Sequence, residues 1–273
     1  MWTRTEGSGR DVVFIHGWTM DHRDEARTYE PIFAGTSGWC RHYLDLPGMG
    51  RTPAKPGLRD MDGMLAALLD AITVLVGSRR FLLAGTSAGA YLARGVLRHL
   101  GERVDGLLLR APLIVPQDAQ RDVDPVQPII VDPSAVEAIP ATERPELGDV
   151  LVQTPSYVQA LREKVHDAVA PAAAAADATF LSPIRQDGNR YSFSFDPDAA
   201  EILFSGPSLV VTGRHDASVG FRDAWRLMSK LPRATFVVLD RAEHGLPIVQ
   251  QELFAALVCD WLGRVEEAQA GRP

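Results

Sequence analysis

The sequence predicts an α/β fold with a mostly parallel central sheet, helices on both faces and an inserted, mainly helical segment. Two observations predict the sheet: short apolar runs recur along the chain, and stretches with helical spacing of apolar residues separate them. A third predicts the insertion, because this alternation stops in the middle of the chain and resumes later. Strands that alternate with helices form right-handed βαβ units, which assemble into an open sheet covered by helices.

Six short apolar runs are predicted to be strands. The first three end at a turn that contains glycine, and continuous apolar runs are typical of strands buried on both faces. They cover residues 12–15, 41–46, 81–84, 107–109, 209–211 and 236–239. Apolar residues three and four positions apart predict helices over residues 61–75, 92–100, 225–231 and 253–262.

The middle of the chain is predicted to be a cap over residues 117–205, inserted into a core made of residues 1–116 and 206–273. Eight of the 19 prolines lie between Pro112 and Pro155. Proline removes a backbone donor and fixes φ, so this density excludes long helices and central strands there.

Later parts of the cap carry clearer patterns. Residues 157–169 have helical spacing, and the alanine-rich stretch 172–176 is predicted to be a small packed helix. Tyr191, Phe193 and Phe195 alternate with polar residues. That alternation predicts a short extended piece.

Composition and charge narrow the class of protein. The chain has 273 residues, of which 46% are apolar and 23% charged, as in ordinary globular proteins. Its net charge of −7 argues against a nucleic acid or an anionic membrane as partner. The charge says nothing more specific about the substrate, and the sequence sets no oligomeric state.

The two cysteines, Cys40 and Cys259, are far apart in the sequence. This spacing makes a disulfide framework or a zinc site unexpected and predicts two buried thiols. The first ten residues hold no apolar run of signal-peptide type, and no window of about 18 residues is apolar throughout. Together these observations predict a protein of the reducing cytoplasm.

The most informative stretch is Gly85-Thr86-Ser87-Ala88-Gly89, which lies between a predicted strand and a predicted helix. In that context the strand must turn sharply into the helix at the serine. Both flanking positions are glycine because a side chain there would collide with the neighbouring strand or helix. Ser87 would then project at the carboxyl edge of the sheet, where open α/β folds bind ligands. The alternative is a plain turn of small residues.

A serine nucleophile needs an oriented base, and the base needs a carboxylate. His244 follows the last predicted strand by a few residues, and Asp216 follows the strand before it. Each has an ordinary alternative role, His244 as a residue at a helix start and Asp216 as a helix cap. The order Ser87, Asp216, His244, with each residue just past a strand, favours a catalytic triad.

An oxyanion hole needs backbone N–H groups aimed at the developing charge. Ala88, directly after the serine, is positioned to supply one such group. Trp18, in the His16-Gly17-Trp18 sequence after the first apolar run, is positioned to supply the second, and Gly17 permits the close approach. His16 itself is predicted to be a buried histidine with a structural role.

With these motifs in view, the chain resembles the α/β-hydrolase fold superfamily, in its cap-bearing group of serine hydrolases. Both ends of the chain carry the matching stretches, which are residues 14–18, 45–50, 85–89, 213–216 and 243–245. The resemblance implies Ser87 as nucleophile, His244 as base and then acid, and Asp216 as the residue that orients it. It also implies Trp18 and Ala88 as oxyanion donors and an insertion that closes over the site as a cap.

The sequence departs from the family in two places. About 11 residues precede the first strong strand, so the usual opening antiparallel strands must be shortened or partly missing. Ala88 and Ala90 flank the elbow where relatives often carry a bulkier residue and another glycine. Both departures bear on the shape of the pocket rather than on the chemistry.

Neither a cofactor nor a metal ion is predicted. The Gly48-Met49-Gly50 stretch reaches Pro53 where a dinucleotide-binding fingerprint needs its third glycine. No His-x-His or His-Glu-x-x-His occurs, and residues 21–23, Asp-His-Arg, are predicted to be a solvated loop. Apolar residues predicted as pocket walls, each equally plausible as ordinary core, are Trp18, Met20, Tyr157, Phe180 and Tyr191.

The reaction favoured by these residues is cleavage of a small-molecule ester, thioester or lactone through an acyl-enzyme. One alternative is hydrolysis of a carbon–carbon bond in a vinylogous diketone, for which Arg185 or Arg190 of the cap would hold a substrate carboxylate. A second alternative is perhydrolase, lyase or cyclase chemistry without a cofactor. A non-catalytic ligand receptor is the least favoured, because a receptor has no need of a complete Ser-Asp-His set.

Overall fold

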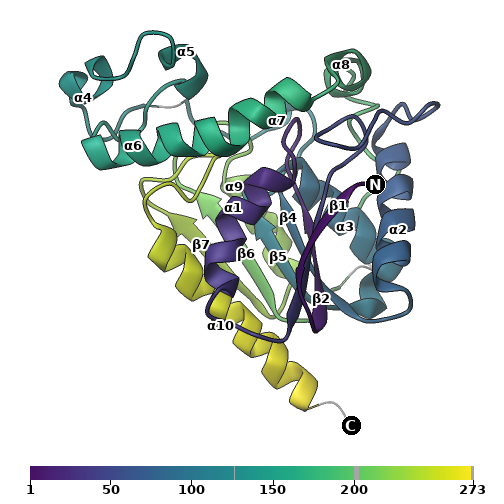
Figure 1. Ribbon diagram of the computed structural model, residues 1–273. Coiled ribbons are helices and arrows are strands. Elements are labelled where there is room, and N and C mark those ends of the chain that lie inside the picture. Colours follow the sequence, from purple (N-terminus) through teal and green to yellow (C-terminus); the bar gives the residue numbers. More distant parts are fainter. Residues whose placement is uncertain (126, 200–202, 272–273) are drawn as a thin grey trace.

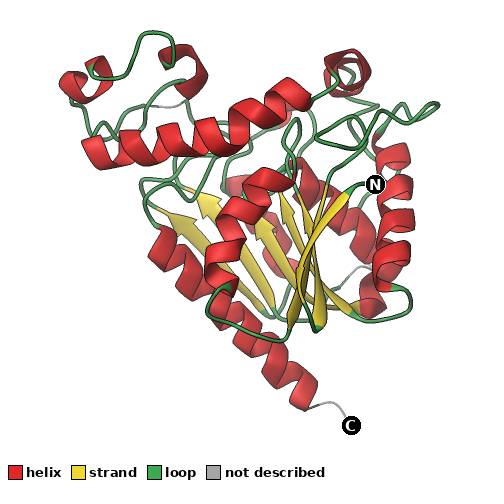
Figure 2. Cartoon of the chain, in the orientation of Figure 1, coloured by secondary structure: helices red, strands yellow, loops and turns green. Residues whose placement is uncertain are grey.

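A seven-stranded, mostly parallel sheet forms the centre of the protein in the computed structural model, which describes residues 1–125, 127–199 and 203–271 (Figures 1 and 2). Within these ranges the strand order is β1-β3-β2-β4-β5-β6-β7. Only β1 runs antiparallel to its neighbour, β3. The strands are β1 Thr3–Gly7, β2 Arg10–Ile15, β3 Trp39–Leu44, β4 Phe81–Thr86, β5 Val104–Arg110, β6 Ser208–Gly213 and β7 Ala234–Leu239. The predicted fold class is confirmed.

Helices cover both faces of the sheet, with α1 and α10 on one side and α2 and α3 on the other (Figure 1). This double cover buries every residue of β4, β5 and β6, which explains why the central residues of those strands are apolar. The helices are α1 His22–Phe33, α2 Met61–Val76, α3 Ala88–Leu100, α4 Pro133–Glu137, α5 Arg144–Leu147, α6 Pro155–Lys164, α7 Ala170–Ala175, α8 Ala178–Gln186, α9 Arg222–Trp225 and α10 Gln251–Ala270.

The segment between β5 and β6 is mainly helical. Helices α6 and α7, joined by a π-helical stretch over Val165–Val169, cross above the carboxyl ends of the strands (Figure 1). Part of this segment has an apolar cluster of its own, which the core residue Ile248 joins. The boundaries 117–205 stay a prediction, and positions 126 and 200–202 lie outside the described residues.

The aromatic stretch at the end of this segment is not a strand. Tyr191 lies in a turn, Phe195 in a bend and Phe193 between two bends, and the ring of Phe193 stacks on Tyr91 of α3 at 4.3 Å between centroids. The predicted extended piece is therefore wrong. The alternation arises because these rings reach the core rather than because they pair in a sheet.

The solvated loop predicted at residues 21–23 is also wrong. Asp21 has no exposed surface and caps α1 by accepting a hydrogen bond from the backbone N–H of Arg23. His22 is also buried, and Asp45 accepts hydrogen bonds from both its backbone N–H and its ring Nδ1. These bonds offset the cost of burying polar groups.

The opening antiparallel part is reduced to the single strand β1 among the described residues, as the short N-terminal stretch predicts. Cys40 is half-buried and Cys259 is exposed, so the prediction of two buried thiols is wrong, because Cys259 lies on the outer side of α10. Among the described residues, no helix combines the length and the apolar composition that crossing a bilayer requires.

Candidate active site

The turn from β4 into α3 holds Ser87 in an unusual backbone conformation, with φ +54° and ψ −118°. A positive φ is uncommon for a residue with a side chain and persists only where the surroundings enforce it. Here the N–H of Ser87 donates to the carbonyl of Arg110 at 3.0 Å. The carbonyl of Ser87 accepts from the N–H groups of Ala90, Tyr91 and Leu113. The serine side chain is thereby fixed at the carboxyl edge of the sheet.

Two glycines make this turn sterically possible. A Cβ at Gly89 would lie 2.2 Å from the carbonyl oxygen of Ile15, and one at Gly85 would lie 2.6 Å from the carbonyl oxygen of Gly89. Both obstacles are backbone atoms and cannot move aside as a side chain would. The Gly-x-Ser-x-Gly sequence therefore reflects the close packing of β2, β4 and α3.

Ser87, His244 and Asp216 lie in one hydrogen-bonded line. Ser87 Oγ and His244 Nε2 are 2.9 Å apart, and His244 Nδ1 lies 2.9 Å from Asp216 Oδ2. A proton on Nδ1 satisfies both contacts, since Nδ1–H then donates to the carboxylate and Nε2 accepts from the serine hydroxyl. The adjacent strands β6 and β7 end side by side and bring together two residues that are 28 positions apart in the sequence.

Asp216 is held as a carboxylate. Its side chain has no exposed surface, and its Oδ1 accepts hydrogen bonds from the N–H groups of Ser218 and Val219 at 2.8 and 3.0 Å. Burial alone would raise its pKa, but the charge and hydrogen bond of His244, with those two N–H groups, hold the pKa of Asp216 below its usual value. A fixed negative charge at this position orients the imidazole and stabilises its protonated form.

The segment after β2 runs alongside the nucleophile. A Cβ at Gly17 would lie 3.3 Å from the Cβ of Ser87, which places the backbone of Gly17 and Trp18 next to the serine. Within the described residues, the backbone N–H groups of Trp18 and Ala88 donate to no carbonyl. Two free N–H groups flanking a serine are the arrangement that an oxyanion hole requires.

His16 supports this segment without reaching the triad. It is fully buried, its Nδ1–H donates to the carbonyl of Gly17 at 2.7 Å, and its Nε2 accepts from the N–H of Leu46 at 3.0 Å. Burial lowers the pKa of His16, which favours the neutral ring that this pair of bonds needs. The structure agrees with a structural role.

The predicted pocket walls separate into two groups. The ring of Tyr191 meets that of Trp18 edge-on at 5.0 Å, and Met20 lies against Gly17, so these three are near Ser87. Phe180 instead packs on Gly48. Tyr157 has no exposed surface and packs in the apolar cluster between β5 and β6, while its hydroxyl reaches Glu243 beside His244, so its role as a pocket wall stays a prediction.

With this geometry described, comparison with known proteins identifies the family. A profile of the α/β-hydrolase family matches residues 12–257. The chain belongs to the α/β-hydrolase family. An α/β superfamily hydrolase from Oenococcus oeni PSU-1 superposes with a TM-score of 0.85 at 27% identity, covering 97% of this chain and 96% of that one.

Other relatives of this hydrolase carry esterase names. The pimeloyl-[acyl-carrier protein] methyl ester esterase of Vibrio parahaemolyticus is 22% identical over 93% of this chain and 95% of its own. The enzyme of the same name from Shewanella woodyi is 28% identical, but the match covers only 37% of this chain and 36% of that relative. An esterase from Thermogutta terrifontis shares the fold, with a TM-score of 0.63 and 22% identity over 97% of this chain and 93% of that one.

No pattern in the sequence indicates the buried ionic network that lies next to the Ser87, His244 and Asp216 line. Arg110, at the end of β5, has a side chain only 1% exposed and donates to Asp24 at 2.6 Å and Glu25 at 2.8 Å on α1. It also donates to Thr86 at the end of β4 and to the carbonyl of Leu246. This arginine therefore joins α1 to the end of β4, directly before Ser87, and to the loop that carries His244.

Lys164 of α6 completes the network. Its ammonium lies 3.0 Å from Asp24 and donates to the carbonyl of Gly245, next to His244, at 2.6 Å. Burial would raise the pKa of Asp24, but the charges of Arg110 and Lys164 hold it well below the usual range. Burial raises the pKa of Glu25 and lowers that of Lys164. Two cations and two carboxyl groups thus link the segment over the site to the loop that carries His244.

A second contact reaches the same loop. The hydroxyl of Tyr157, on α6, donates to Glu243 at 3.0 Å, directly before His244. Burial raises the pKa of Glu243, and the nearby charge of Asp216 adds to the shift. The histidine is therefore flanked by two residues, Glu243 and Gly245, that α6 holds in place.

Replacing Asp216 tests the hydrogen-bonded line. Asp216→Asn keeps the shape but favours the wrong imidazole tautomer, and we expect kcat on an ester substrate to fall on the order of 10⁴-fold, as in a comparable triad. Asp118→Asn is the matched control, because Asp118 is exposed and pairs with Arg185 and Arg121. Equal, mild effects of the two substitutions on kcat would contradict the assignment of Asp216.

Replacing Lys164 tests the buried network. Lys164→Met removes one partner of a buried ion pair, which we expect to lower the free energy of unfolding by about 3 kcal/mol in urea denaturation. Arg27→Met is the control, because Arg27 also links α1 to this segment, through Asp167, but at the surface. It should cost about 1 kcal/mol or less. If Lys164→Met lowered the free energy of unfolding no more than Arg27→Met does, the buried network would stabilise the fold no more than a surface ion pair.

Proposed function

We propose that this α/β hydrolase is a serine esterase of the cytoplasm that cleaves a small-molecule carboxylic ester through an acyl-enzyme. The single observation that carries the proposal is the hydrogen-bonded line from Ser87 through His244 to Asp216, with 2.9 Å at each step. The esterase names of the relatives support an ester over the thioester and lactone that share its acyl carbonyl.

The reaction follows from the roles of these groups. Ser87 Oγ attacks the ester carbonyl while His244 Nε2 takes the hydroxyl proton, and Asp216 stabilises the imidazolium that forms. The N–H groups of Trp18 and Ala88 bind the oxyanion of the tetrahedral intermediate. His244 then returns the proton to the departing alcohol, which leaves Ser87 acylated. Water, activated by the same histidine, hydrolyses the acyl-enzyme and restores the serine.

No contact favours the carbon–carbon hydrolase over the esterase. Arg185 is paired with Asp118, and its guanidinium stacks over the ring of Tyr191 at 4.7 Å. Arg190 is paired with Asp187. Both arginines therefore have carboxylate partners within the described residues, and neither is an unpaired cation waiting for a substrate carboxylate.

The proposal is tested with p-nitrophenyl esters of increasing acyl length. The wild-type protein should hydrolyse at least one of them, and Ser87→Ala should lower kcat/KM by several orders of magnitude because the triad acts as a unit. Ser78→Ala is the matched control, since Ser78 is exposed in the turn between α2 and β4.

Either of two results would contradict the proposal. One is that Ser87→Ala retains the wild-type rate, which would mean that another group is the nucleophile. The other is that folded wild-type protein is inert on every ester of the series, which would favour the alternatives of altered chemistry or ligand binding alone.

A further inference from the structure

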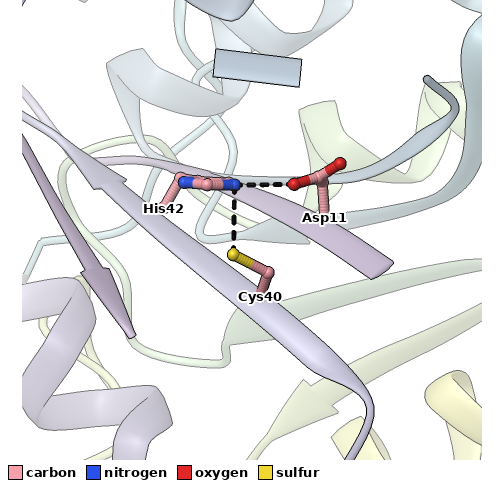
Figure 3. A group of neighbouring side chains, drawn as sticks. All are labelled: Asp11, Cys40 and His42. Carbon is pink, nitrogen blue, oxygen red and sulfur yellow. Dashed lines mark hydrogen bonds and ion pairs between the residues drawn. The ribbon is translucent and has the colours of Figure 1, made fainter. Parts of the chain in front are cut away.

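A cysteine, a histidine and an aspartate converge at the opposite end of the sheet from Ser87 (Figure 3). Asp11 lies near the amino end of β2, Cys40 near the amino end of β3, and His42 in the second half of β3. The parallel register pairs Asp11 with Cys40, and His42 follows two residues later on the same strand. Residues two apart on a strand share a face, so all three side chains point to one side.

Two of these groups point at the same nitrogen. Asp11 Oδ1 lies 2.8 Å from His42 Nε2, and Cys40 Sγ lies 3.5 Å from that same atom (Figure 3). All three candidate ligand atoms lie within 4.8 Å of one another. A single ring N–H can serve only one of these acceptors well, whereas a cation between them would be bound by all three.

We propose that Asp11, Cys40 and His42 form a zinc site that stabilises this edge of the sheet. Thiolate, imidazole and carboxylate are the ligands that Zn²⁺ takes in proteins, at about 2.0–2.3 Å in tetrahedral geometry. Those bond lengths put neighbouring ligand atoms roughly 3.3–3.6 Å apart, so the observed 3.5 Å between sulfur and nitrogen fits. The 2.8 Å contact of Asp11 needs to open by about 0.5 Å, a small side-chain movement.

The surroundings suit such a site. Thr5 Oγ1, on β1, lies 3.0 Å from His42 Nδ1, so the second ring nitrogen has a partner that fixes the ring when Nε2 binds metal. Arg79 contacts both carboxylate oxygens of Asp11, Oδ2 at 2.7 Å and Oδ1 at 3.2 Å, so zinc binding would replace the longer contact to Oδ1 and keep the one to Oδ2. Asp11 and His42 are buried while Cys40 is half-buried, so water reaches the fourth position from the side of Cys40.

Binding is balanced in charge and protons. Cys40 gives up its thiol proton to solvent and binds as thiolate, and His42 binds as the neutral ring with its proton on Nδ1. The thiolate and the carboxylate bring two negative charges to Zn²⁺, and Arg79, which stays paired with Asp11, leaves one positive charge at the protein surface. The ion would tie β2 directly to β3, and through Thr5 to β1.

Asp21, His22 and Asp45 form a second group of metal-binding side chains in the described part of the chain, and both oxygens of Asp45 already accept backbone hydrogen bonds. Asp45 already accepts hydrogen bonds from two groups of His22 and from the N–H of Arg51. Asp21 caps α1 and pairs with Arg23. The group also lacks a thiol.

Cobalt(II) provides the test, because a thiolate ligand gives Co²⁺ a charge-transfer band in the near ultraviolet. Full-length protein, first dialysed against a chelator, is titrated with Co²⁺ and then with Zn²⁺. We expect one Co²⁺ per chain, a thiolate band that Zn²⁺ abolishes, and a higher thermal midpoint with Zn²⁺ bound. Hydrolysis of esters at the distant site should not change, so this result is independent of the proposed function.

Matched variants decide the ligands. Cys40→Ser should lose the thiolate band and the thermal shift, whereas Cys259→Ser, at the other and exposed cysteine, should keep both. Thr5→Val should keep the band but bind Co²⁺ about 10-fold more weakly. Far-ultraviolet circular dichroism confirms that each variant is folded. The absence of a thiolate band in folded wild-type protein, or its persistence in Cys40→Ser, would overturn the proposal.

Discussion

Ser87 adopts its positive φ because three backbone segments meet at one point. The end of β4 turns into α3 there, and the carbonyls at the end of β2 lie against α3 so closely that position 89 admits only glycine. The same contact brings Gly17 and Trp18 beside the serine. The elbow therefore fixes both the direction of the Ser87 hydroxyl and its position beside the backbone of Gly17, and the loops that carry His244 and Asp216 have a defined point to reach.

Buried charge is one of the interactions that join the segment over the site to the core. Lys164 of α6 reaches Asp24 and the carbonyl of Gly245, while Arg110 holds Asp24, Glu25 and the carbonyl of Leu246. Breaking a buried ion pair costs more than the pair gains over an apolar substitute, so such networks fix one arrangement rather than add much stability. In this protein the fixed arrangement is the position of the His244 loop relative to α6.

The sequence was informative wherever a function leaves a local mark. Gly85 and Gly89 flank Ser87 because of a steric demand within five residues, and Asp216 and His244 each follow a recognisable strand. Arg110 and Lys164 left no such mark, since their partners lie far away in the sequence and a charged residue is usually exposed. For a related reason, the spacing of Tyr157 does not separate a pocket wall from ordinary core, because an apolar side chain on a helix faces either one, and only packing decides which.

The site near Cys40 shows the same limit on local patterns. The two-residue spacing of Cys40 and His42 is visible in the sequence, but Asp11 joins them only through the pairing of β2 with β3. Register is a property of the assembled sheet, which is why no metal site was expected from the spacing of the cysteines alone.

The central claim is that Ser87 is an activated nucleophile, and intact mass after treatment with a fluorophosphonate tests it most directly. Folded wild-type protein should gain the mass of one adduct, and Ser87→Ala and urea-unfolded wild-type protein should gain none, because only the assembled triad activates the serine. An unlabelled folded wild type, or a label that persists in Ser87→Ala, would contradict the account.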